Sequence, residues 1–76
     1  MYDRHHPAPP EQIRTRRGMS SAPREYGLIL LMWQDADFTW RTIHGQWCEM
    51  TNTWVADAVL TGSRELPATP THWNHS

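Results

Sequence analysis

His44 and Cys48 are the pair in this sequence whose residue types could carry out nucleophilic or metal chemistry. If the segment is helical, their spacing of four places both side chains on one face. A Cys–His nucleophile also needs a residue that orients the base, and a zinc site needs three or four ligands. The sequence has no third residue at a suitable spacing and none of the common catalytic motifs. We therefore expect a non-enzymatic protein with no cofactor and no bound metal.

A cluster of arginines near the N-terminus points to a different chemistry, which is contact with phosphate groups. It comprises Arg14, Arg16 and Arg17, and all seven basic residues of the chain are arginine. Guanidinium groups suit phosphate because they present several donors in one plane. The net charge of −1, however, is unlike that of a strongly cationic nucleic-acid-binding protein.

The segment TWVADAVLTGSRELP, residues 53–67, resembles the end of a helix-turn-helix recognition helix. In that motif a Gly and an Arg follow the helix before a Pro. The upstream half departs from the pattern, because residues 50–53 occupy the inter-helix turn and the usual Gly is absent. The resemblance implies a small DNA-binding or regulatory module as the alternative function, with four contacts to nucleic acid: Arg14, Arg16, Arg17 and Arg64.

Four tryptophans recur every seven residues, at positions 33, 40, 47 and 54. Residues seven apart stay on one face of a helix, whereas along a strand an odd spacing sends successive side chains to opposite faces. The positions three residues after each tryptophan are mostly apolar, which is the pattern of a coiled-coil seam. The spacing therefore predicts a helical stripe that forms an interface: Tyr26, Ile29, Trp33, Trp40, Ile43, Trp47, Met50 and Trp54.

The elements that would position this stripe divide the chain into three parts. Residues 1–20 are predicted to be an extended Pro/Arg-rich arm, residues 21–62 the helical core, and residues 63–76 an extended tail. Ser21 and Pro23 are typical of a helix start, and Gly62 and Pro67 of a helix end. The predicted fold class is all-α, with the core forming a long helix, a helical hairpin or a bundle.

A small antiparallel β-meander is the alternative fold. Thr and Trp favour strands, and Gly45 destabilises a helix by about 1 kcal/mol relative to Ala. The strands would lie near residues 27–33, 38–43, 46–50 and 54–60. The apolar segment LILLM, residues 28–32, opposes this alternative because it shows no alternation.

An exposed stripe of this size would promote aggregation, so we expect a partner to cover it. The expected function is protein–protein association, with the chain as an oligomer or as a subunit of a larger complex such as a viral or phage structural or accessory component. The longest apolar run is far shorter than the roughly 20 residues of a membrane-spanning helix. The N-terminus has no apolar signal segment. We expect a location in the cytoplasm or within a larger assembly, without membrane contact.

Overall fold

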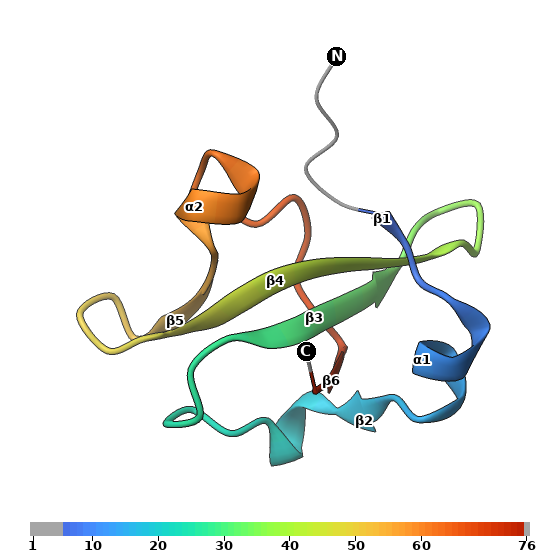
Figure 1. Cartoon of the computed structure of the whole chain (residues 1–76), viewed down its shortest axis with the longest axis horizontal. Helices are drawn as coiled ribbons and strands as arrows, with labels where there is room; N and C mark the ends of the chain where they lie inside the picture. Colours follow the sequence, from blue (N-terminus) through green and yellow to red (C-terminus); the bar gives the residue numbers. More distant parts are fainter. Residues whose placement is uncertain (1–5, 76) are drawn as a thin grey trace.

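The computed structural model describes residues 6–75 and shows a six-stranded antiparallel β-sheet with short helical segments (Figure 1). The strands are β1 (His6–Pro7), β2 (Arg17–Gly18), β3 (Ile29–Gln34), β4 (Trp40–Cys48), β5 (Thr53–Ala56) and β6 (His72–Asn74). The helices are α1 (Pro10–Arg14) and α2 (Ala58–Thr61), with a 3-10 turn η1 (Met19–Ser21). The prediction of an all-α, helical core is therefore wrong, and the antiparallel β alternative agrees with the structure.

The strand order across the sheet is β1-β4-β3-β6-β2. β5 also pairs with β4, because β4 is long enough to hold β1 and β5 along different parts of one edge. The segments expected to be extended arms thus contribute β1, β2 and β6. Residues 1–5 of the predicted arm and residue 76 of the predicted tail lie outside the described residues.

The tryptophan spacing has its explanation in the strand register. Trp47 lies directly opposite Trp54 across the β4–β5 hairpin, with ring centroids 5.3 Å apart. Directly opposed residues of a hairpin share a face and are an odd number apart when an even number of residues forms the loop. Trp33 and Trp40 take opposite faces, since Trp33 pairs with Arg41 in the β3–β4 register. The prediction of a helix assumed that an odd spacing puts two side chains on opposite faces of a sheet. That assumption holds only along one continuous strand and not across a hairpin.

One face of the sheet, here called the core face, carries the hydrophobic core. Its buried residues come from β3, β4, β5 and β6 and alternate along the strands: Ile29, Leu31, Trp33, Ile43, Ala56 and Trp73. Met19 and Ala22 pack against this cluster from the η1 segment, and Leu66 and Ala68 from the segment before β6. Every second residue of these strands therefore faces a covering layer built from both ends of the chain.

The opposite face, here called the second face, is covered in part by α1. Leu30 and Met32 are buried there, which explains why the apolar run in β3 shows no alternation. Asn74 Nδ2 donates a hydrogen bond to Thr15 Oγ1 at 2.6 Å and one to the Gln12 carbonyl at 3.4 Å. These bonds hold the end of α1 against β6.

Gly45 lies where β3, β4 and β5 meet. A Cβ at this position would approach Leu31 Cδ1 and the Val55 carbonyl oxygen to 2.5 Å. The residue that disfavoured a helix is therefore required by close strand packing.

The structure has a helix end at Gly62, as predicted, but no helix start at Ser21. Gly62 ends α2 in the left-handed conformation at φ 81°, and Asp57 caps its start by accepting a bond from the Val59 amide. Ser21 instead closes η1, so the helix predicted to begin there is absent. Within residues 6–75, no helix has the length and apolar character needed to span a membrane.

Candidate nucleic-acid interface

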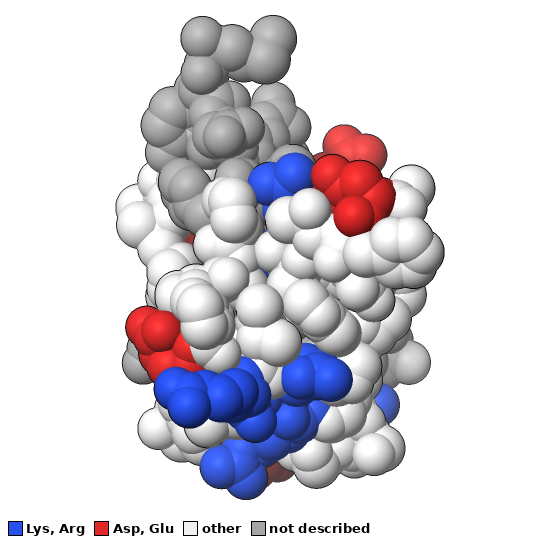
Figure 2. Space-filling view, turned by 90° about the vertical axis from the view of Figure 1, so that its right-hand side faces the viewer, with Lys and Arg blue, Asp and Glu red and all other residues white. Residues whose placement is uncertain are grey.

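Arg14, Arg16 and Arg17 lie together where α1 leads into β2, and all three are exposed. Arg14 is the last residue of α1 and Arg17 the first residue of the edge strand β2. Figure 2 views the side on which Figure 1 places α1 and shows basic side chains gathered in its lower half. We call these three residues the basic cluster.

Arg16 is held over an aromatic ring of the second face. Its guanidinium carbon lies 4.7 Å from the centroid of the Trp40 ring, and Nη1 donates a 2.6 Å bond to the Ile13 carbonyl. Trp40 in turn makes an edge contact with His72, with centroids 5.2 Å apart. A guanidinium held over a ring keeps its remaining N–H groups directed outward in its own plane, where they can meet a phosphate.

Arg17 makes the corresponding contact with a ring of the core face. Its guanidinium carbon lies 5.7 Å from the Trp73 ring centroid. Trp73 is buried, and its Nε1 donates a 3.1 Å bond to Ser21 Oγ. The ring that supports the Arg17 side chain is therefore itself fixed by the bond to Ser21.

Two more rings continue from Trp73 towards solvent. His75 lies 5.0 Å from Trp73 between centroids, and Tyr26 lies 5.7 Å from His75. His75 is exposed and Tyr26 is 64% exposed. The basic cluster thus adjoins accessible aromatic rings.

None of the three arginines of the basic cluster forms an ion pair with a described carboxylate, although Glu11 stands one turn before Arg14 in α1. Within residues 6–75, the only ion pair joins Arg41 Nε to Asp35 Oδ2 at 2.7 Å, in the turn between β3 and β4. Cationic groups without acidic partners are available to an anionic ligand. The local surface can therefore be basic although the chain has a net charge of −1.

Arg64 does not join the basic cluster. Its Nη2 donates a 3.3 Å bond to Cys48 Sγ, and its carbonyl accepts a bond from the Ala56 amide. Because β5 pairs with β4 and β2 forms the far edge beyond β6, Arg64 lies across the sheet from Arg17. The structure brings together three of the four arginines that the alternative function named.

The eight residues of the predicted stripe do not form one surface. Ile29, Trp33 and Ile43 are buried in the core face. Trp40 lies on the second face, while Tyr26 and Met50 are exposed in loops. Trp47 and Trp54 pair with each other across the β4–β5 hairpin. An association surface would have to use a subset of these residues.

His44 and Cys48 point to the same side of β4 but are not neighbours. Four residues of strand span about 13 Å, whereas on a helix the two side chains would be adjacent. No group of three potential metal ligands occurs in the described part of the chain. Hydrogen bonds from the Thr51 side chain and backbone, with smaller effects of the Met50 backbone and the Arg64 charge, lower the Cys48 pKa below its ordinary value, although desolvation opposes this.

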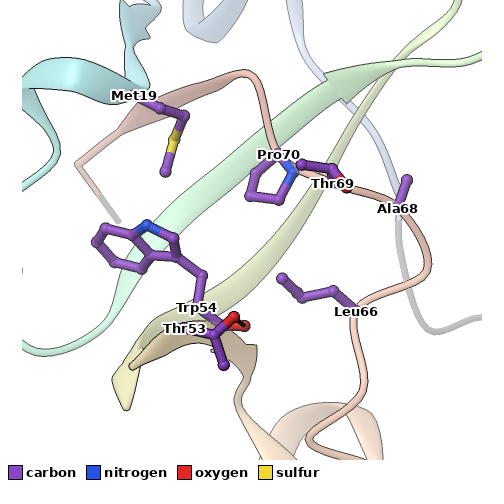
Figure 3. A pocket seen from close by; sticks show the side chains of 7 residues that line it. All are labelled: Met19, Thr53, Trp54, Leu66, Ala68, Thr69 and Pro70. Carbon is purple, nitrogen blue, oxygen red and sulfur yellow. Dashed lines mark hydrogen bonds between the residues drawn. The ribbon is translucent and has the colours of Figure 1, made fainter. Parts of the chain in front are cut away.

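A groove of about 420 Å³ lies beside Trp54. In Figure 3, Met19 and Trp54 line one side, and Leu66 and Pro70 face them from the segment before β6. Thr53, Ala68 and Thr69 complete a lining without charged side chains. This groove therefore suits apolar contact but offers no group that would select an anionic ligand.

The sequence reasoning missed Trp73, His72 and His75. All three lie in the predicted tail, and Trp73 falls outside the series of four tryptophans. An aromatic residue among polar neighbours near the end of a chain is a weak signal for a strand. Comparison of the chain with known protein families, curated proteins and solved structures finds no match.

Proposed function

We propose that this protein is a small non-enzymatic module that binds nucleic acid through contacts between phosphates and the basic cluster. The observation that carries the proposal is the group of three exposed guanidiniums without a described acidic partner. Two of them, on Arg16 and Arg17, are held over indole rings. Stacking limits their motion before a ligand arrives, so less side-chain entropy is lost on binding.

The size of the basic cluster sets the expected strength of binding. Phosphate contacts release counterions, so three contacts give a slope of about −2 to −3 for log K against log salt concentration. Non-specific binding of this kind falls at about 10⁻⁴–10⁻⁶ M.

The test is a titration of a labelled oligonucleotide, followed by fluorescence anisotropy at several salt concentrations. We expect binding at low salt that weakens steeply as salt rises. In Arg14→Ala/Arg17→Ala, the slope falls by about two, because each lost phosphate contact removes about one.

The chain supplies a matched control, Arg24→Ala/Arg64→Ala, which removes the same charge outside the basic cluster. Arg24 stacks on the Trp47 ring at 4.1 Å, so each variant loses one stacked arginine and one other. Equal losses of oligonucleotide affinity in the two variants would mean that binding depends only on the overall charge of the protein. Absence of binding by the unmodified protein at low salt would end the proposal.

A further inference from the structure

We infer that the nucleic acid bound is single-stranded, with a base stacking on Tyr26, beside His75, while phosphates contact the basic cluster. This inference rests on the proposed function. Its starting point is the continuous line of contacts from Arg17 through Trp73 and His75 to Tyr26. The line begins with a cation and ends with accessible rings.

The two outer rings can receive a base. Tyr26 precedes β3 in a loop and is 64% exposed, and His75 follows β6 and is exposed. Their planes meet at 59°, so the two rings do not cover each other as a parallel stack would. Trp73 beneath them is anchored by its bond to Ser21. The structure therefore presents an aromatic platform that does not need to unfold before it contacts a ligand.

Stacking of this kind selects single strands. In a duplex the bases already stack on one another, whereas in a single strand their faces are free to meet aromatic side chains. Positive groups beside aromatic rings are the usual means of binding single strands without sequence preference. The arrangement of Arg17, His75 and Tyr26 has both parts.

The structure offers little for reading a duplex. The major groove admits a recognition helix or a two-stranded β-ribbon, but α1 has 5 residues and α2 has 4. The β4–β5 hairpin lies on the other side of the sheet from β2 and the basic cluster. α2 lies in the segment that resembles a recognition helix, beside β5 and away from the basic cluster. The helix-turn-helix resemblance therefore does not extend to the structure.

An acidic residue next to Tyr26 gives the aromatic rings and the arginines different roles in binding. Glu25 directly precedes Tyr26 and is exposed. A carboxylate at this point repels phosphate, so it favours base contact at Tyr26 and phosphate contact at the arginines. Glu25→Gln should strengthen binding.

The experiment measures the affinity of the full chain for labelled oligo(dT), oligo(U) and a DNA hairpin duplex at one low salt concentration. We expect each single strand to bind on the order of tenfold more tightly than the duplex, because one or more bases add stacking. Tyr26→Ala should lower single-strand affinity on the order of tenfold and leave duplex affinity unchanged. Tyr26→Phe should retain the affinity, since the ring remains.

Phe38→Ala is the matched control, because Phe38 is 79% exposed in the β3–β4 loop, outside the line of rings. It should leave affinity for every probe unchanged. Duplex affinity equal to or above single-strand affinity, or equal effects of Tyr26→Ala and Phe38→Ala, would overturn the inference while leaving phosphate binding intact. Failure of all three probes to bind would overturn the proposed function itself. Tighter binding of both single strands than of the duplex, reduced by Tyr26→Ala and unchanged by Phe38→Ala, supports the inference.

Discussion

The two faces of the sheet are built by different physical means. The core face closes over six buried hydrophobic residues, with further apolar side chains packed on them. The second face mixes buried Leu30 and Met32 with buried Thr42 and Asn74, and it holds α1 by hydrogen bonds and by the Arg16–Trp40 contact. Packing on the core face therefore maintains the sheet and supports Arg17 through Trp73, whereas directional contacts on the second face hold α1 and Arg16.

The N-terminal segment depends on these directional contacts because it has few apolar groups. Ile13 is its only aliphatic residue larger than Ala before η1, and it is half-buried. Ordering a residue's backbone costs about 1–2 kcal/mol, so the bonds and ring contacts of residues 12–17 must offset much of that cost. The basic cluster is therefore expected to loosen before the sheet does.

Leu31→Ala against Leu30→Ala is the strongest test of the difference between the faces. The residues are adjacent in β3, and the substitution is identical, but Leu31 faces the core cluster and Leu30 the second face. We expect a loss in unfolding free energy of about 3–5 kcal/mol for Leu31→Ala and about 2–3 kcal/mol for Leu30→Ala. Urea denaturation measures both, and equal losses would remove the distinction.

Gly45→Ala tests how tightly the core face is packed. The new Cβ would meet the Val55 carbonyl oxygen and Leu31 Cδ1, and the backbone atom cannot move aside alone. Overpacking of this kind costs about 1–3 kcal/mol. Gly18→Ala is the control, since nothing lies within 4 Å of a Cβ there, and it should change stability by less than about 0.5 kcal/mol. Thermal denaturation of both variants would decide the matter, and a neutral Gly45→Ala would show that the strands can separate.

Asn74→Ala tests the bonds that hold α1 on the second face. It removes the donor to Thr15 Oγ1 and to the Gln12 carbonyl, so we expect a loss of about 1–2 kcal/mol. Amide hydrogen exchange should quicken in residues 12–17 more than in β3 and β4. Uniform quickening across the sheet would contradict a separate role for the second face.

The smallest expected effect concerns Cys48 on the second face, whose ionisation makes alkylation and stability depend on pH. Thr51→Val removes the largest cause of the lowered Cys48 pKa, so the pKa should rise and alkylation at mildly alkaline pH should slow. Arg64→Ala should produce a smaller rise, because the Arg64 charge contributes least. The pH profile of alkylation measures both midpoints.

The sign of the linked stability follows from the lowered pKa. The folded protein favours the thiolate, so its contribution is present above the ordinary thiol pKa of 9.0 and is lost as pH falls through the lowered value. Thr51→Val should therefore reduce stability at alkaline pH and leave it unchanged at neutral pH. A loss of stability equal at both pH values would show that Thr51 acts by packing instead.

The strand segments of the β alternative could be predicted in outline. Strands expected near 27–33, 38–43, 46–50 and 54–60 correspond to β3, to two parts of β4, and to β5. The break between the strands expected near 38–43 and 46–50 is absent, because Gly45 pairs with both Ile29 and Ala56 inside the sheet. A glycine that signals a turn in sequence can equally mark a close approach of strands, and only the neighbouring strands distinguish the two.

The candidate site was predictable only as a list of arginines. Arg14, Arg16 and Arg17 are close in sequence and so remain close in space. Their aromatic supports could not be foreseen, since Trp40 comes from β4 and Trp73 from β6. Arg64 was grouped with them by its charge and by the helix-turn-helix resemblance, and the strand order separates it.

The sequence by itself determined the local features of this protein: the basic cluster, the Gly62 helix end and the strand-favouring Thr and Trp residues between positions 39 and 54. These depend on short-range sterics and charge, which act between residues close in the chain. Tertiary structure alone decided that Trp47 opposes Trp54, that Trp33 and Trp40 face opposite sides, and that β6 lies between β3 and β2. A spacing of seven suits both a helix face and a hairpin pair, and only the pairing of β4 with β3 and β5, which joins residues far apart along the chain, selects the strand arrangement.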